Sequence, residues 1–175
     1  TANSSLDCMK YSVSGNMGGK VIRCEGSYPT GSLLIVETTD EDGQKSYEFK
    51  DGFGNVMLKR QEADGEFADT YYIYDNIGRL RYVLSPSYQE YSDLQKFGYE
   101  YRYDKDGRCV WKRLPGCEYQ QMWYDAADNL MFSQDGEQRK KGLFVFYLYD
   151  KMKREVLMGT STATRQRVAN TVNVG

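Results

Sequence analysis

Aromatic and large apolar side chains alternate with polar ones along most of this chain. Around Asp75, for example, Tyr72 and Tyr74 precede the Asp and Leu80 and Tyr82 follow it, each pair two residues apart. A period of two places such side chains on one face of a β-strand. The pattern therefore predicts pairs of strands, each pair joined at an Asp.

The Asp begins a five-residue pattern: Asp, two variable residues, Gly or a substitute, then Arg or Asn. The chain carries it at Asp51-Gly-Phe-Gly54-Asn55, Asp75-Asn-Ile-Gly78-Arg79, Asp104-Lys-Asp-Gly107-Arg108, Asp125-Ala-Ala-Asp128-Asn129 and Asp150-Lys-Met-Lys153-Arg154. The intervals between successive Asp residues are 24, 29, 21 and 25 residues. Repeats of about this length are typical of stacked units that bury their faces against neighbours.

The turn chemistry predicts how the two strands of each pair meet. Gly78 and Gly107 occupy the third position of a three-residue hairpin loop, where a positive φ costs glycine nothing. Counting the Asp as position zero, we expect zero to pair with plus four and minus three with plus seven. The predicted pairs are Asp75 with Arg79, Asp104 with Arg108, Asp150 with Arg154, Tyr72 with Tyr82, Tyr101 with Trp111, and Met122 with Phe132.

Two copies depart from the pattern. Lys153 replaces the Gly and favours a different turn there, whereas Asp128 tolerates the left-handed region. In the first copy Tyr47 and Phe49 fall at minus four and minus two, one position out of step, and we interpret this copy as degenerate.

These elements predict an all-β fold, an antiparallel meander of roughly ten to twelve strands in tandem hairpins. Only the connection 85–98 has room for a helical turn, which we expect at 91–97. The predicted organisation is an N-terminal hairpin region at 1–27, the repeat array at 28–158, and a polar tail or truncated next repeat at 159–175.

Two stretches carry the repeat almost in full, Tyr72-Ile-Tyr-Asp-Asn-Ile-Gly-Arg-Leu80 and Tyr101-Arg-Tyr-Asp-Lys-Asp-Gly-Arg108. They resemble the YD-repeat, or RHS-repeat, proteins, whose consensus reads roughly Tyr-x-Tyr-Asp-x-x-Gly-Arg-Leu. Further blocks are similar to the large RHS proteins of Bacteroides and relatives, among them Tyr28-Pro-Thr-Gly-Ser-Leu33 and Arg113-Leu-Pro-Gly116.

The resemblance implies a strand-rich repeat that winds into a curled or spiral sheet. In complete relatives this sheet closes into a shell around a toxic C-terminal domain, and the proteins are secreted or displayed at the cell surface. This chain lacks the family's terminal core segment and any recognisable toxin domain. We therefore expect a fragment of a larger surface protein, a partial RHS-type shell whose first partner is the rest of its parent chain.

The amino-acid composition limits which catalytic and metal sites the chain can form. Histidine is absent, which removes Ser-His-Asp and Cys-His arrangements and most zinc sites. The Asp-Gly turns at 40–43 and 104–107 resemble the opening of a calcium loop, but Arg108 stands where the next ligand would be. We expect no enzyme activity, no cofactor and no metal; the enzyme alternative rests only on unassigned carboxylates.

Net charge and hydropathy indicate which classes of partner the chain can bind. The net charge is −2, which argues against nucleic-acid binding. No apolar stretch approaches the roughly 20 residues of a membrane span. Cys8 and Cys24 flank a Gly-rich turn at 15–19, and a bridge between them stays an open alternative to free thiols.

The aromatic residues leave one functional alternative. If part of the aromatic stripe is exposed, Trp123, Tyr88 and Tyr91 are candidates to stack on sugars or clamp an extended peptide. The chain would then be a carbohydrate- or peptide-binding surface module. Exposed edge strands of a cut array also predict a homodimer formed by strand pairing.

Overall fold

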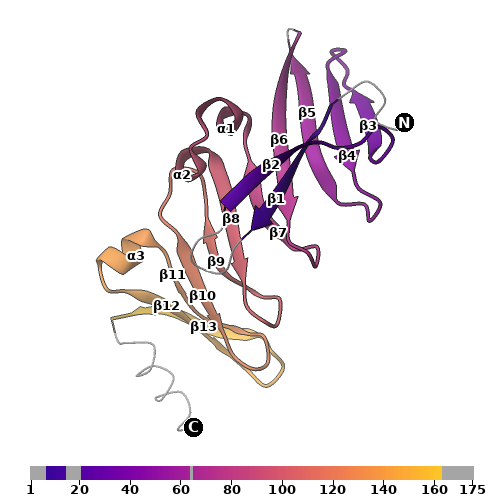
Figure 1. Cartoon of the computed structure of the whole chain (residues 1–175). Coiled ribbons are helices and arrows are strands. Elements are labelled where there is room, and N and C mark those ends of the chain that lie inside the picture. The colour runs from indigo at the N-terminus through magenta and orange to yellow at the C-terminus, as the bar shows by residue number, and fades with distance from the viewer. Residues whose placement is uncertain (1–6, 15–20, 64, 163–175) are drawn as a thin grey trace. The chain divides into compact units, whose positions relative to one another are not determined.

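The structure is a computed structural model, in which residues 7–14, 21–63 and 65–162 are described. These residues form thirteen β-strands and three short helices (Figure 1). The strand pairs whose register is described are all antiparallel, and the main sheet follows the chain order from β3 to β13 without closing. The predicted all-β antiparallel meander is confirmed.

The chain divides into two compact units, residues 1–100 and 101–175. The first unit holds a separate two-stranded sheet, β1 (Met9–Ser14) with β2 (Val21–Ser27). Its other strands follow in order, and the last of them crosses into the second unit: β3 (Leu34–Thr39), β4 (Lys45–Lys50), β5 (Val56–Ala63), β6 (Glu66–Tyr74), β7 (Leu80–Leu84) and β8 (Gly98–Tyr103).

The core of the first unit lies between the main sheet and the β1–β2 hairpin. Phe49, Leu58, Ile73 and Tyr82 are each at most 1% exposed. Met9, Tyr11, Val13, Ile22 and Tyr28 of the hairpin region pack against this cluster. The predicted N-terminal hairpin region thus supplies the layer that covers one face of the sheet.

A buried ion pair fastens this layer. Arg60 on β5 and Asp69 on β6 are cross-strand partners, with Nε–Oδ1 and Nη2–Oδ2 distances of 2.7 and 2.6 Å. Arg60 Nη2 also donates to the Asp7 carbonyl at 3.1 Å, just before β1. The guanidinium lies 5.6 Å from the Phe49 ring centroid and 4.8 Å from that of Phe67.

The long connection after β7 forms two helical turns, α1 (Pro86–Tyr91) and α2 (Leu94–Phe97). The sequence predicted only one, at 91–97. Pro86 opens α1 because its fixed φ suits the first helical turn. Ser92 then adopts a left-handed φ of 53°, and the Asp93 carboxylate accepts from Gln95 and Lys96 N–H to restart the chain as α2.

The second unit continues the meander with another unforeseen helix. Its elements are β9 (Cys109–Arg113), β10 (Gln120–Tyr124), β11 (Leu130–Gln134), α3 (Gly136–Lys140), β12 (Phe144–Tyr149) and β13 (Glu155–Ser161). Helix α3 begins at a capping box: Asp135 Oδ1 accepts from Gln138 N–H at 2.8 Å, and Gln138 Oε1 accepts from Asp135 N–H at 2.9 Å. That Asp-x-x-Gln signal was present in the sequence.

The predicted register past the turn is wrong by one residue. Tyr74 faces Leu80, but a β-bulge then places Tyr82 opposite Ile73, and Tyr72 opposite Val83. The same shift occurs between Phe49 and Lys50, Trp123 and Tyr124, and Leu148 and Tyr149. Met122 accordingly faces Ser133, and Phe132 faces Trp123. The predicted pair Tyr101–Trp111 stays a prediction.

The bulge determines which side chains of the second arm lie on the buried face of the sheet. It inserts one extra residue at plus six, so minus two and plus seven become partners. In the first unit these are Phe49 with Leu58 and Ile73 with Tyr82, all buried. The first copy is therefore regular and not degenerate, because its Phe49 and Tyr47 lie on the buried face.

The four cysteines are free thiols, so the possible bridge between Cys8 and Cys24 is absent. Cys24 faces Tyr11 in the register, whereas the Cys8 carbonyl accepts from Tyr28 N–H at 2.8 Å. Burial raises the pKa of the Cys8 thiol to about 12.

The Gly-rich turn at 15–19 and residues 163–175 lie outside the described residues, while residues 159–161 complete β13.

Candidate functional site

The five Asp turns share one hydrogen-bond pattern, seen clearly at Asp75. Its Oδ1 accepts from Ile77 N–H at 3.2 Å and from Arg79 N–H at 2.9 Å, and its Oδ2 accepts from Arg79 Nε at 2.9 Å. Its backbone closes the hairpin, because Asp75 N–H donates to the Arg79 carbonyl and Gly78 N–H donates to the Asp75 carbonyl. The side chain thus caps its own turn.

The residue at plus four always donates a planar N–H to the second carboxylate oxygen. Asn55 Nδ2 and Asn129 Nδ2 do so at 2.9 and 2.8 Å, while Arg108 Nε and Arg154 Nε do so at 2.7 Å. Arg and Asn are interchangeable there because both offer this donor. The chain carries the same closure at Asp40, where Gln44 N–H and Asp42 N–H donate to Oδ1. The calcium-loop resemblance at 40–43 is therefore a turn of this kind.

At four of the turns, hydrogen bonds favour the charged form of the carboxylate and lower its pKa. Burial alone raises the pKa of Asp75, but the Arg79 N–H and guanidinium outweigh it and the pKa falls below the ordinary 3.8. The same balance lowers the pKa of Asp104 and of Asp125. At Asp150 the Arg154 N–H leads, and the pKa is again lowered.

The fourth turn residue lies in the left-handed region in every copy. Gly54, Gly78 and Gly107 have φ of 86°, 82° and 86°. Asp128 has φ 67° and Lys153 has φ 61°. Lys153 N–H donates to the Asp150 carbonyl at 3.0 Å, as Gly does elsewhere. The prediction of a different turn at Lys153 is wrong; Lys accepts the strained conformation instead.

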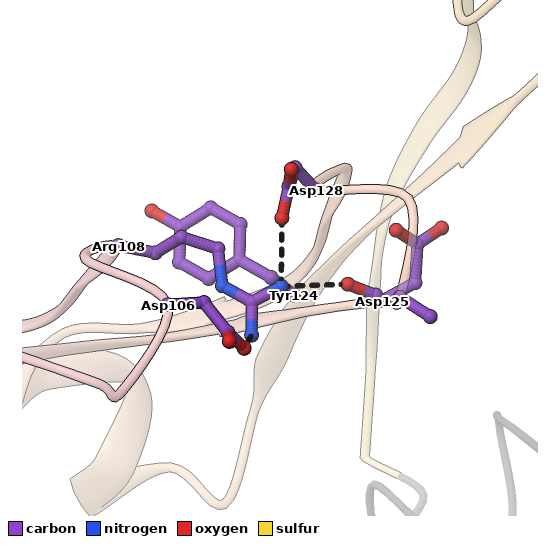
Figure 2. Close-up of a pocket in the computed structure, with 6 residues that line it drawn as sticks. Asp106, Arg108, Tyr124, Asp125 and Asp128 are labelled. Carbon is purple, nitrogen blue, oxygen red and sulfur yellow. Dashed lines mark hydrogen bonds and ion pairs between the residues drawn. The ribbon is translucent and has the colours of Figure 1, made fainter.

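In the second unit, side chains connect one turn to the next (Figure 2). Arg108 Nη1 donates to the Asp125 carbonyl at 2.8 Å and to Asp128 Oδ1 at 2.9 Å. Its Nη2 donates to Asp106 Oδ2 at 3.0 Å, and its guanidinium carbon lies 5.4 Å from the Tyr124 ring centroid. These residues line an open hollow of 460 Å³. The Arg108 guanidinium lies in this hollow, and its nitrogens already donate hydrogen bonds to oxygens of the protein itself.

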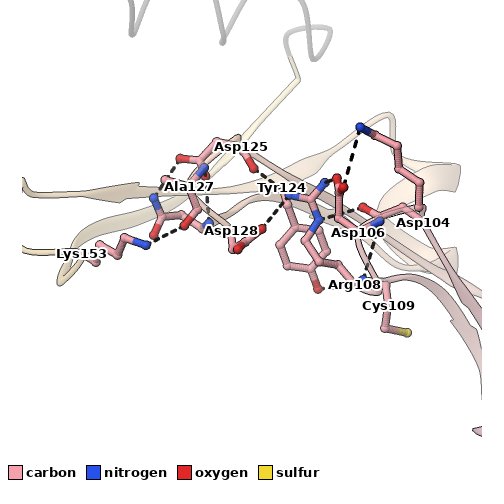
Figure 3. Close-up of polar contacts among 11 residues, drawn as sticks. Asp104, Asp106, Arg108, Cys109, Tyr124, Asp125, Ala127, Asp128 and Lys153 are labelled. Carbon is pink, nitrogen blue, oxygen red and sulfur yellow. Dashed lines mark hydrogen bonds and ion pairs between the residues drawn. The ribbon is translucent and has the colours of Figure 1, made fainter. Parts of the chain in front are cut away.

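A second link joins the following turn (Figure 3). Lys153 Nζ donates to the Ala127 carbonyl at 2.8 Å. The turns at 104–108, 125–129 and 150–154 are thus connected in sequence by Arg108 and Lys153. Within the described part of the chain, no group of three or more Cys, Asp or Glu side chains is arranged to hold a metal ion.

Two of the Tyr residues that precede a turn Asp tie their hairpins to the preceding one. Tyr74 OH donates to the Val56 carbonyl and Tyr124 OH to the Cys109 carbonyl, each at 3.1 Å. Both acceptors stand at plus five of the preceding copy, and Val56 is the residue next to the plus-six insertion of its hairpin. At Val56 the Tyr hydroxyl therefore supplies a hydrogen bond where the bulge interrupts the ladder. Sequence reasoning missed this role, although the Tyr at minus one was its signal.

A column of cations and rings also escaped prediction. Arg102 lies 4.1 Å from the Trp111 ring centroid, Trp111 stacks on Tyr119 at 5.3 Å, and Arg139 lies 3.6 Å from the Tyr119 ring centroid. Arg139 Nη2 donates to the Tyr119 carbonyl at 2.7 Å. The column fastens α3 to the loop before β10. Its members are half-buried.

The three stacking candidates lie on two elements, one in each unit. Trp123, on β10, is half-buried, with its ring centroid 5.8 Å from that of Phe144. Tyr88 and Tyr91 lie on α1: Tyr88 is half-buried against the core, and Tyr91 is 60% exposed with its ring 5.4 Å from Phe97. Tyr91 is the one of the three whose ring is mostly open to solvent.

The described residues thus define an open antiparallel sheet of tandem, Asp-capped hairpins. No family model matches the chain, and no curated protein matches it. Among solved structures, one chain in a mutant form of the Tc holotoxin pore of Photorhabdus luminescens is similar in fold, with a TM-score of 0.56 and 12% identity over 79% of this chain. The match covers 8% of that chain.

No helix among the described residues is long and apolar enough to cross a membrane.

Proposed function

We propose that this chain is a non-enzymatic structural segment of an RHS/YD-repeat surface protein. It contributes hairpins to a β-shell that encapsulates or displays a C-terminal, toxin-like domain. The observation that carries the proposal is the repeated tie between hairpins, in which Tyr74 and Tyr124 each donate to the plus-five carbonyl of the preceding hairpin. Such a tie serves stacking of successive units and has no part in chemistry.

The state of the charged groups supports a structural role. The turn carboxylates accept hydrogen bonds from their own turns, and Arg108 donates from Nε, Nη1 and Nη2 to the protein itself. A catalytic acid or base needs a pKa close to the working pH. The pKa of Asp75, Asp104 and Asp125 moves the other way.

The fold likeness supports the setting of the proposal. The similar chain belongs to a toxin pore assembly, and the match covers 8% of that one chain. We accordingly place the parent protein outside the cell or on its surface, with the rest of that parent as the chief partner of this segment.

Protease protection tests the proposal. The complete protein should be digested natively and its C-terminal region followed by mass spectrometry. An enclosed region survives until the repeats are weakened, for instance by Tyr124→Phe combined with Asp125→Ala. A C-terminal region cut equally fast in both proteins contradicts enclosure.

A second function, binding of glycan or peptide, is favoured by the exposed ring of Tyr91, with Trp123 half-exposed on another element. Titration calorimetry against glycan and extended-peptide panels tests it. Binding that Tyr91→Ala or Trp123→Ala abolishes and Ile77→Ala preserves supports this function. No heat with any panel member removes it.

A further inference from the structure

Strand β7 of the first unit carries a buried cation at a repeat position that is otherwise apolar. Arg81 stands six residues after Asp75 and is the extra residue of the bulge between β6 and β7. It is 5% exposed. In the other four copies the same position holds a half-buried or exposed apolar side chain, namely Met57, Val110, Met131 and Val156.

A second buried arginine shows what a guanidinium needs in this chain. Arg60 is 8% exposed, and the Asp69 carboxylate accepts hydrogen bonds from its Nε and Nη2. The Asp7 carbonyl accepts a further hydrogen bond, and the rings of Phe49 and Phe67 lie against the guanidinium. Burial of a charge is costly unless hydrogen bonds and an opposite charge compensate it, and Arg60 has both.

Arg81 has no such compensation within the described part of the chain. Its Nε is closed to solvent and has no hydrogen-bond partner there. No described residue forms an ion pair with Arg81 or places an aromatic ring against it. An arginine side chain remains charged at any pH at which proteins are folded. The guanidinium of Arg81 therefore calls for an acceptor that the described residues do not supply.

The geometry of the side chain defines the chemistry of that acceptor. A guanidinium offers its N–H groups in one plane, which matches the paired oxygens of a carboxylate or a phosphate group. Nη1 and Nη2 of Arg81 are not closed to solvent as Nε is, so a ligand approaches the end of the side chain. The following residues Tyr82, Val83 and Leu84 are at most 9% exposed. An ion pair formed in such surroundings is stronger than one on an open surface.

We propose that Arg81 anchors an oxyanion-binding site, in which the two Nη atoms donate to a carboxylate or phosphate group. A free anion and the acidic side chain of a bound peptide both present this pair of oxygens. The inference concerns the 175-residue chain itself and does not depend on the shell function.

Denaturant unfolding with and without sodium phosphate, at an ionic strength held constant with sodium chloride, tests the site. A ligand that binds only the folded chain lowers the unfolding equilibrium constant, about tenfold when its concentration is about ten times its Kd. We expect this response in the wild type and its loss in Arg81→Met, which introduces the side chain that two other copies carry at this position. Arg81→Lys keeps the charge without the planar group and should respond less.

The matched control is Arg23→Met, which removes an exposed arginine of β2 and should respond to phosphate as the wild type does. A blocked Gly–Glu peptide, compared with the same peptide carrying Gln, determines the source of the oxyanion. A response to phosphate assigns the site to a free anion, and a response to the Glu peptide alone assigns it to an acidic side chain.

Nuclear magnetic resonance locates the contact, because the Arg81 Nε–H signal should shift saturably with phosphate or with the Glu peptide. Arg81→Met identifies that signal by its absence. A wild type that responds to neither probe overturns the inference. So does a response of equal size in Arg81→Met, because that outcome assigns the effect to general salt stabilisation.

Discussion

At the scale of single residues, the Asp of each turn acts as a small clamp whose strength depends on its charge. The folded pKa of Asp75, Asp104, Asp125 and Asp150 lies below the ordinary value of 3.8. A lowered folded pKa contributes stability that is present above the unfolded pKa and is lost as pH falls through the folded value.

The corresponding prediction concerns acid. Denaturant unfolding should give a steady free energy of unfolding from neutral pH to about 5, with a fall below pH 4. Asp75→Asn keeps the shape but loses the charge, so its stability should change less between pH 5 and 3 than that of the wild type. An equal acid dependence in both proteins contradicts the clamp.

The Tyr hydroxyl at minus one gives a sharper residue test. Tyr124→Phe removes the hydrogen bond from the Tyr124 hydroxyl to the Cys109 carbonyl. We expect a loss of about 1 kcal/mol in the free energy of unfolding. Tyr91→Phe, in a 60% exposed ring, is the control and should change nothing measurable. Equal effects of the two substitutions on the free energy of unfolding would contradict a stabilising role of the Tyr124 hydroxyl.

Residue identities allowed the turns to be predicted, because Asp, Gly and a planar donor at plus four form a local unit. The role of Tyr124 was not predictable in the same way. Its acceptor, Cys109, lies in the preceding hairpin, 15 residues away along the chain, so no local motif links the two. Likewise, Arg102, Trp111, Tyr119 and Arg139 meet through the fold and share no local motif.

At the scale of elements, the turn at 150–154 carries a correctable strain. Lys153 sits at φ 61°, a region that glycine enters freely. Lys153→Gly should raise the free energy of unfolding by about 0.5–1 kcal/mol, less the small exposed hydrogen bond to Ala127.

Gly107→Ala is the reverse experiment. The site has φ 86° and no atom near the added Cβ, so only backbone strain is introduced. It should lower stability by about 1 kcal/mol, again by denaturant unfolding. If Lys153→Gly destabilises and Gly107→Ala does not, the shared turn geometry is refuted.

The β1–β2 hairpin depends on the buried pair beneath it. Asp69→Ala leaves Arg60 charged, buried and without its carboxylate, which should cost about 3–5 kcal/mol. The double variant Arg60→Met with Asp69→Leu should cost less, because no charge is stranded. Faster amide exchange in β1 of Asp69→Ala would locate the damage, and unchanged exchange there would contradict the fastening role of Arg60.

Element types followed from period-two alternation, yet the register did not. Each arm of a hairpin keeps its own alternation on either side of the bulge, so nothing within one arm reveals the extra residue at plus six. The pattern therefore pointed to Tyr72 with Tyr82, while the structure pairs Ile73 with Tyr82. Helix α3 was not predicted, although its capping residues Asp135 and Gln138 are visible in the sequence.

At the scale of the molecule, the chain is an array whose parts are stabilised by their neighbours. At plus seven, Leu58, Tyr82 and Phe132 are buried, whereas Trp111 is half-buried and Leu157 on β13 is 52% exposed. An array of this kind can form part of a wall and can hold other parts of a protein at a fixed distance, which suits a structural segment of a larger protein.

The most direct test of the central claim is to determine the complete reading frame that contains this segment. The account predicts further copies of the Tyr-x-Tyr-Asp-x-x-Gly-Arg pattern adjoining it and a distinct C-terminal domain for the array to enclose. A frame with no further copies and no such domain would contradict the shell function and leave ligand binding as the alternative.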